Sequence, residues 1–152
     1  PLVSPGYYKN PEATAEVREF GWHHTGDVGV MSDDGYITIV DRKKDMIISG
    51  GFNVFPNEIE QVLSTHEAVQ EAAVIGVPDD KWGESVKAII QLKPGCSVAP
   101  EELMELVKKE LGSVKAPKSV DFLAQLPRSP VGKVLKADLR KQYWEGRARA
   151  VN

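Results

Sequence analysis

The sequence has little cysteine: Cys96 is the one thiol among 152 residues. A single thiol excludes an internal disulfide framework and a cysteine-based zinc site, and it favours a reducing compartment such as the cytoplasm. Excess charge of one sign is also missing, because 19 Lys and Arg face 22 Asp and Glu, for a net charge of -3. No broad field is therefore expected to gather nucleic acid or anionic membrane, and any phosphate binding must be local.

Long apolar runs are absent as well, and no signal peptide pattern opens the sequence. We therefore expect no membrane span. The hydrophobic content of 41% suffices for one ordinary core with a small appendage. The chain starts at Pro1, and its first residues, PLVSPGYYKN, show no periodic apolar pattern. This start predicts a piece of a longer polypeptide.

Two short alternating segments, 28–31 and 36–40, are separated by the turn-forming residues SDDG. Their spacing predicts a β-hairpin. The charged run DRKKD at 41–45 follows and indicates a linker between two units.

Mixed helix and strand patterns fill the rest of the chain. Pro56 suits the first turn of a helix with Ile59 and Leu63 on one face. Further elements are expected as strands at 69–77, 85–92 and 120–123, and as helices at 100–111, stopped by Gly112, and at 137–145. The predicted fold class is α+β, a small mixed sheet with packed helices preceded by the short hairpin.

Four sequence motifs occur in one order along the chain: GWHHTGD at 21–27, DRKKDMIISGG at 41–51, FPNEIE at 55–60 and PRSPVGK at 127–133. Together they resemble the C-terminal part of the adenylate-forming enzymes, the acyl-CoA synthetases, with relatives among luciferases and peptide-synthetase adenylation domains. The sequence lacks the phosphate loop rich in glycine, serine and threonine that this family carries in its large N-terminal domain. The resemblance therefore implies an incomplete enzyme that is inactive alone.

The resemblance implies a division of the chain into three parts. Residues 1–42 would be the tail of the large adenylation domain, 43–46 a hinge, and 47–152 a mobile C-terminal domain. The implied reaction joins a carboxylic acid and ATP into an acyl-adenylate, and the acyl group then passes to CoA. ATP, CoA and Mg²⁺ are the implied substrates and cofactor, with Mg²⁺ held mainly by the large domain.

Three side chains are implied in adenylation. Lys133 resembles the lysine that stabilises charge between carboxylate and phosphate, although alone it would be interpreted as an exposed loop lysine. Asp27 resembles the residue that holds the ribose hydroxyls, with a turn cap as its alternative. Arg42 resembles a second ribose or phosphate contact, and its alternative is a surface ion pair with Asp41 or Asp45.

Lys44 falls at the position that resembles the family's hinge residue, around which the small domain rotates between the two half-reactions. Such a position needs backbone freedom more than side-chain chemistry. A polar linker residue is the ordinary alternative.

The resemblance also implies a CoA site. Gly50 and Gly51 would line the path of the pantetheine arm, or else form a tight turn before Phe52. Trp82 would stack near the CoA nucleotide, or else belong to the core. Lys115 and Lys118 are predicted as contacts to CoA phosphates.

No histidine metal site is expected. His23 and His24 are adjacent, so that on a strand they would point to opposite faces, and His66 is isolated in sequence. One of the adjacent pair is expected to pack or hydrogen-bond near the nucleotide.

Three functions remain open. The first is the C-terminal part of an AMP-forming acyl-CoA ligase. The second is an adenylation domain that loads a carrier protein, and the third is a noncatalytic nucleotide- or protein-binding module. A lysine acetyltransferase that modifies Lys133 is a further implied partner, because acetylation would remove the charge. The wording of the motifs resembles ligases for fatty or aromatic acids.

Overall fold

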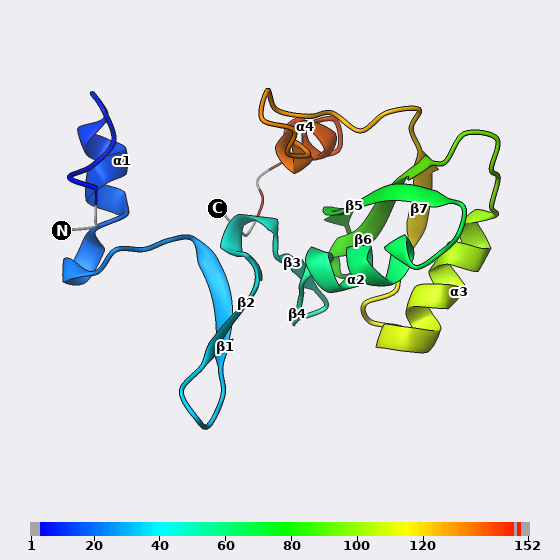
Figure 1. Ribbon diagram of the computed structural model, residues 1–152, viewed down its shortest axis with the longest axis horizontal. Coiled ribbons are helices and arrows are strands. Elements are labelled where there is room, and N and C mark those ends of the chain that lie inside the picture. Colours follow the sequence, from blue (N-terminus) through cyan, green and yellow to red (C-terminus); the bar gives the residue numbers. More distant parts are fainter. Residues whose placement is uncertain (1–3, 148, 150–152) are drawn as a thin grey trace.

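Two long antiparallel strands form the centre of the larger part of the molecule. The computed structural model describes residues 4–147 and 149 (Figure 1). Residues 1–3 of the predicted segment 1–42, and residues 148 and 150–152 of the predicted domain 47–152, lie outside the described residues. β5 (Val69–Asp79) pairs with β6 (Gly83–Leu92) along nearly its whole length, and each strand has a continuous run of buried residues, at 73–76 in β5 and 84–90 in β6. Continuous burial is expected for strands with both faces covered.

The remaining strands extend this sheet on the other side of β6. The strand order is β4-β3-β6-β5, and β7 (Ser119–Phe122) pairs with β6 in parallel. β3 (Ile47–Ser49) and β4 (Phe52–Val54) form a small hairpin that the sequence did not predict. The strands predicted at 69–77, 85–92 and 120–123 are present with boundaries shifted by one or two residues.

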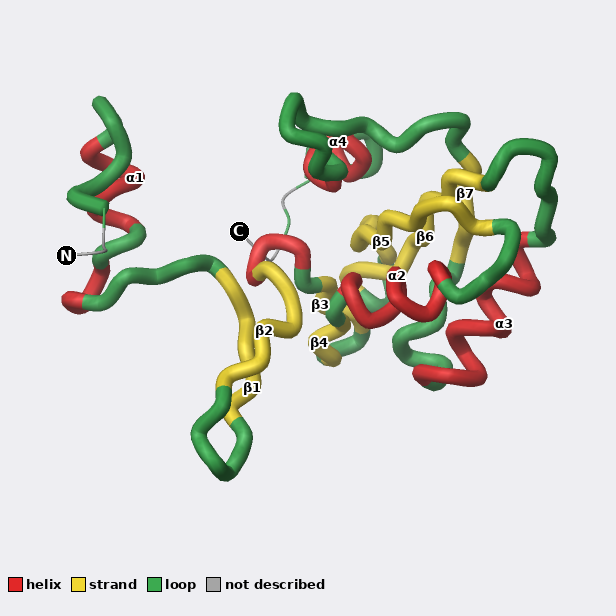
Figure 2. Tube along the Cα trace, viewed as in Figure 1, coloured by secondary structure: helices red, strands yellow, loops and turns green. Residues whose placement is uncertain are grey.

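Helices α2 (Pro56–Ser64) and α3 (Pro100–Leu111) pack on one face of the sheet (Figures 1 and 2). Each begins with proline and has acidic residues in its first turn, where a helix favours negative charge. Ile59, Leu63, Leu103 and Val107 are fully buried against the sheet strands. Gly112 ends α3 with a φ of +84°, as predicted.

The opposite face carries a smaller core. Leu126 and Leu139 pack there against Ala73, Ile75 and Ile89. Leu139 belongs to α4 (Lys136–Lys141).

The predicted helix at 137–145 was too long at its C-terminal end. After Lys141 the chain turns, and Tyr143 donates to Asp121 while the Trp144 indole N–H donates to the Gly76 carbonyl at 3.0 Å. These contacts with the sheet replace further helical turns.

Residues 4–42 project from this body (Figure 2). β1 (Asp27–Met31) and β2 (Ile37–Arg42) form the predicted antiparallel hairpin. A short helix, α1 (Pro11–Glu16), capped by Asn10, and a 3₁₀ turn, η1 (Glu19–Gly21), precede it, and the sequence predicted neither. With the mixed sheet and its packed helices, the predicted α+β fold class is confirmed.

Candidate functional site

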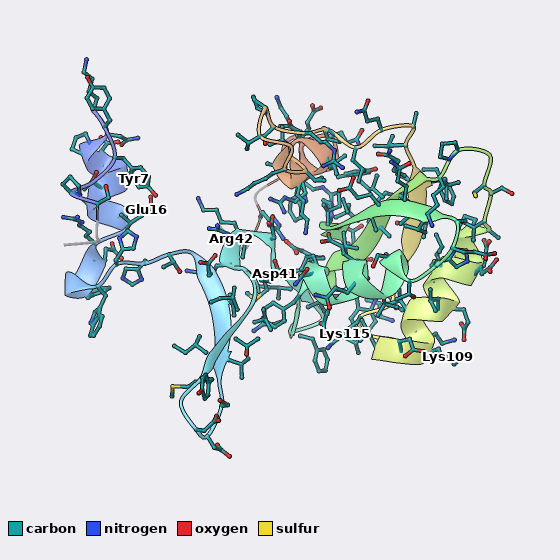
Figure 3. The ribbon with its side chains drawn as sticks, viewed as in Figure 1. Tyr7, Glu16, Asp41, Arg42, Lys109 and Lys115 are labelled. Carbon is teal, nitrogen blue, oxygen red and sulfur yellow. The ribbon has the colours of Figure 1, made fainter. Side chains whose placement is uncertain are left out.

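An open cleft of about 690 Å³ lies between the N-terminal segment and the segment that follows Lys133. Its lining includes His24, Gly26 and Arg42 on one side and Leu135 and Lys136 on the other. Figure 3 shows Arg42 at the end of β2, between α1 and the larger part of the molecule. Residues of the first two motifs therefore share one cleft with the segment that directly follows the fourth motif, more than 90 residues further along the sequence.

Asp27 and Arg42 face each other across the base of the hairpin, where they are paired in the strand register. The Arg42 Nε atom lies 2.9 Å from Asp27 Oδ1, and Arg42 also donates to the Thr25 carbonyl at 3.4 Å. The predicted alternative for Arg42, a pair with Asp41 or Asp45, is not what the structure has. Because only one oxygen of Asp27 is engaged with Arg42, the carboxylate keeps an oxygen to accept a hydrogen bond from a ligand.

Lys133 lies in a tight loop with an exposed side chain. Its backbone N–H donates to Ser129 Oγ at 3.1 Å, and its carbonyl accepts from the Ser129 N–H at 2.8 Å. Gly132 has a φ of +82°, a conformation that closes this turn. Among the described residues the Lys133 ammonium has no ion-pair partner, so it can reach a ligand.

Ion pairs tie the two ends of this loop to the body of the domain, one end to β5 and the other to α2. Arg128 pairs with Glu71 before the loop. After it, Lys136 Nζ lies 2.7 Å from Glu60 Oε1, and both side chains are mostly buried. Burial raises the pKa of the Glu60 carboxyl even though Lys136 favours its charged form. The ties fix where the backbone of Lys133 sits while leaving its side chain exposed.

The predicted hinge at 43–46 contains a 3₁₀ turn, η2 (Lys43–Asp45). The Lys44 side chain is exposed, in agreement with both interpretations of that residue. Its neighbour Asp45 accepts from Arg140 of α4 at 2.7 Å. Asp41, near the end of β2, accepts from the Asn57 N–H of α2 at 2.8 Å, and Figure 3 labels Asp41 on the side of β2 toward α2.

The structure brings Gly50, Gly51 and Trp82 together. The two glycines form the turn between β3 and β4 with φ values of +58° and +83°, as the tight-turn alternative required. The Gly50 N–H donates to the Trp82 carbonyl at 2.9 Å. A Cβ on Gly50 would lie 2.6 Å from the indole ring, so the ring rests directly on the glycine backbone. Trp82 remains 45% exposed and is available for stacking.

The two lysines predicted as CoA phosphate contacts bind within the chain. Lys115 Nζ lies 2.7 Å from Glu58 Oε2 of α2, and Figure 3 shows Lys115 beside that helix. Lys118 donates to the Ser113 carbonyl at 2.8 Å. Either amino group would have to exchange its present partner for a phosphate oxygen.

Comparison with known proteins places this chain in a family. Residues 58–133, half of the chain, match the family described as AMP-binding enzyme C-terminal domain. The chain belongs to this family. The predicted resemblance is therefore confirmed.

Curated relatives of this AMP-binding C-terminal domain include a long-chain-fatty-acid–CoA ligase of Yersinia pestis. It is 49% identical over 93% of the chain and 25% of the relative. A feruloyl-CoA synthase of an Amycolatopsis species is 46% identical over 94% of the chain and 29% of the relative. The chain thus spans about a quarter of the length of the curated relatives that it matches.

A solved structure of the same family is also similar. It is the o-succinylbenzoate CoA synthetase (MenE) of Bacillus subtilis in complex with the acyl-adenylate intermediate OSB-AMP, with 35% identity and a TM-score of 0.84. The alignment covers 99% of this chain and 29% of that one.

Several residues near the site carried no clear signal in the sequence. One ion pair joins Arg140 to Asp45 of the predicted hinge. Another joins Arg149 to Glu84, and Arg149 also donates to the Lys44 carbonyl. The partners of these arginines lie 65 to 105 residues away in the sequence, so no local pattern indicated these pairs.

Neither a metal cluster nor a membrane helix occurs in the described part of the chain. No group of three or more His, Cys, Asp or Glu side chains there could hold a metal ion. His24 lines the cleft and contacts the Glu19 carbonyl at 3.1 Å. None of the described helices has the length and apolar content needed to cross a bilayer.

Proposed function

We propose that this chain is the C-terminal part of an AMP-forming acyl-CoA ligase. The observation that carries the proposal is the cleft in which Arg42 faces the segment directly after Lys133. The whole enzyme would join a carboxylic acid to ATP, release pyrophosphate and then transfer the acyl group to CoA with loss of AMP. The 152-residue chain alone would be inactive, because the acyl pocket and phosphate loop would belong to a large N-terminal domain of the same polypeptide.

Lys133 would act in the first half-reaction. A carboxylate oxygen attacks the α-phosphorus of ATP, a new oxygen–phosphorus bond forms, and the bond to pyrophosphate breaks. Two anions approach each other in this step, so a cation between them lowers the barrier. An exposed ammonium on a loop tied at both ends meets this need, because its backbone is fixed and its side chain is unpaired within the described residues.

Asp27 and Arg42 would hold the nucleotide. Arg42 engages one oxygen of Asp27, which leaves the second free to accept from a ribose hydroxyl. The ion pair also orients the guanidinium so that its remaining N–H groups can donate to the ribose or a phosphate. Mg²⁺ would arrive with the ATP phosphates and be held mainly by the large domain.

The face formed by Gly50, Gly51 and Trp82 would receive CoA. The open side of Gly51, where an added Cβ would contact nothing within 4 Å, allows a pantetheine arm to lie against the backbone. The exposed indole can stack on adenine, and Lys115 and Lys118 would exchange their partners for CoA phosphates. Fatty or aromatic acids are the substrate classes that we favour.

We place the reaction in the cytoplasm, where a free and exposed Cys96 stays reduced. We also keep acetylation of the exposed Lys133 by a protein lysine acetyltransferase as part of the proposal. The acetyl group would remove the charge that adenylation needs.

The test uses the full-length enzyme with Lys133→Ala and a control, Lys109→Ala, on the exposed side of α3 (Figure 3). We expect ATP–pyrophosphate exchange to fall by about 10²- to 10³-fold for Lys133→Ala, the range for loss of one group that stabilises charge in a transition state. Thioester formation from supplied acyl-adenylate should persist, and Lys109→Ala should match the wild type. Unchanged exchange in Lys133→Ala would contradict the proposal and favour a noncatalytic module.

A further inference from the structure

The side chain of Arg149 reaches back across the chain to the segment predicted as the hinge. Its Nη1 atom donates to the Lys44 carbonyl at 2.7 Å, and Nη2 donates to the Met46 carbonyl at 2.8 Å. The same guanidinium holds Glu84, with Nε at 2.7 Å from Oε1 and Nη2 at 3.1 Å from Oε2. One side chain therefore joins a carboxylate of the sheet to two carbonyls around the turn.

Glu84 is a fixed anchor for this guanidinium. It is 2% exposed, and its Oε2 atom also accepts from the Ile48 N–H of β3 at 3.2 Å. The carboxylate packs so closely over Gly76 that a Cβ there would lie 2.4 Å from Oε2. A buried carboxylate needs a paired cation, so Glu84 and Arg149 hold each other in place.

The geometry requires arginine. Two parallel N–H groups engage the carboxylate while others point to Lys44 and Met46, which a planar fork of five donors allows. A lysine would supply one point charge and could not span the carboxylate and both carbonyls.

Rotation of the backbone at Lys44 would turn the carbonyl that Arg149 holds. A change in ψ of Lys44 moves its oxygen relative to the sheet, so the 2.7 Å hydrogen bond must break. A second tie acts on the next residue, because Asp45 is paired with Arg140 of α4. In the orientation fixed by these ties, Leu135 and Lys136, directly after Lys133, line the cleft shared with Arg42.

We propose that Arg149, anchored by Glu84, is a positioning residue for adenylation. It holds the backbone on both sides of Lys44 in the orientation that turns the loop of Lys133 toward the nucleotide cleft. This proposal rests on the proposed function, because it assigns the rotation to Lys44 and the chemistry to Lys133. Arg149 lies outside the four motifs. Loss of its hydrogen bonds to the Lys44 and Met46 carbonyls should slow adenylation and leave thioester formation intact.

The experiment compares Arg149→Lys with Arg147→Lys in the full-length enzyme. Arg147 offers the matched control, because its pair with Asp80 is 3.4 Å long, exposed, and makes no contact with the segment 43–46 among the described residues. Arg149→Lys keeps a positive charge beside Glu84 and loses the donors to the carbonyls. Arg149→Ala and Glu84→Gln then remove the charge pair itself.

Two half-reactions are measured: ATP–pyrophosphate exchange, and single-turnover thioester formation from supplied acyl-adenylate and CoA. For Arg149→Lys we expect exchange to fall about tenfold, the scale of a lost charge-assisted hydrogen bond that biases two orientations. Thioester formation should stay within about twofold of the wild type or rise. Arg147→Lys should leave both rates unchanged.

Equal loss of both half-reactions in Arg149→Lys would overturn the proposal, since a purely structural role lowers both, and so would unchanged exchange. Lys133→Ala, measured in parallel, separates the two proposals. If it leaves exchange intact, the proposed function fails. If it abolishes exchange while Arg149→Lys behaves like Arg147→Lys, only the positioning role of Arg149 fails.

Discussion

The hairpin of β1 and β2 exposes apolar side chains of the same kind that β5 and β6 bury. Val30, Ile37 and Ile39 are 60%, 67% and 59% exposed, whereas Ile75 and Ile90 are 0% exposed. None of the described residues from 4 to 42 is buried. The difference does not come from strand propensity, because both regions carry Val and Ile along paired strands.

What separates the two regions is a second layer. β5 and β6 are covered on one face by α2 and α3 and on the other by α4 and the segment from Leu126. The hairpin has no such cover within the described residues, and a two-stranded ribbon alone is marginal in water. In the proposed whole enzyme, the large N-terminal domain would supply the missing layer.

The largest expected contrast is in backbone protection. In the 152-residue chain, kept monomeric, amides of β6 should exchange with solvent about a thousandfold more slowly than those of β1 and β2. The reason is that β6 opens only with the whole core, while the hairpin opens locally. Hydrogen exchange followed by mass spectrometry measures both regions in one sample. Strong protection of 27–42 in the monomer would show that the hairpin is stable without a covering layer.

A core truncation tests the same contrast in stability. Ile90→Ala should lower the free energy of unfolding by about 2–5 kcal/mol, because it opens a cavity in a closed core. Ile39→Ala removes as many atoms from an exposed position and should change the free energy by less than about 0.5 kcal/mol. Urea unfolding of both variants gives the comparison. Similar losses would mean that the hairpin packs in solution against a surface.

The elements that the sequence predicted best are those with strong local patterns. α3 has proline at its start, glycine at its end and a regular apolar face, and its predicted range of 100–111 is the observed one. β3 and β4 have three residues each, too few for an alternating pattern, so they were missed. α4 was predicted too long, because Tyr143 and Trp144 make distant contacts with Asp121 and Gly76 instead of continuing the helix.

The residues of the candidate site also differ in how far the sequence could predict them. Asp27, Arg42 and Lys133 lie in short motifs and could be predicted through the family resemblance. Arg149 could not, because its contacts with Glu84 and the Lys44 carbonyl join residues 65 and 105 positions away in the sequence. Only the folded chain brings these groups together.

Two turns that contain glycine, one in the exposed hairpin and one in the packed domain, offer a test with a smaller expected effect. Gly50 and Gly35 both have positive φ, at +58° and +86°, but a Cβ on Gly50 would meet Trp82 while one on Gly35 would meet nothing within 4 Å. Gly35→Ala should cost about 1 kcal/mol or less, the backbone strain alone. Gly50→Ala should cost about 2 kcal/mol and shift the Trp82 indole resonance, because the ring must also move. Equal costs, measured by urea unfolding, would mean that the contact between glycine and indole is not maintained in solution.

The smallest expected effect concerns the tyrosines, whose surroundings differ between the two regions. Tyr7, Tyr8 and Tyr36 are exposed in the N-terminal segment, whereas Tyr143 donates to Asp121 at 2.8 Å. Burial and the Asp121 carboxylate raise the pKa of Tyr143 to about 12 from its usual value of 10.0. Burial opposes ionisation of Asp121, but hydrogen bonds from Lys87 and Tyr143 outweigh it and lower the pKa of that carboxyl.

The raised pKa sets the sign of the pH dependence. The fold favours the protonated phenol of Tyr143. Its contribution to the free energy of unfolding is therefore complete below pH 10 and is lost as the pH rises toward 12. Tyr143→Phe should therefore cost about 1 kcal/mol at pH 8, and this cost should shrink above pH 10. Tyr36→Phe should cost nothing measurable at either pH. Urea unfolding checks the cost, and the absorbance difference at about 295 nm between wild type and Tyr143→Phe should titrate near 12. A difference that titrates at the usual value would mean that the contact with Asp121 does not persist in solution, and that this tyrosine behaves like those of the N-terminal segment.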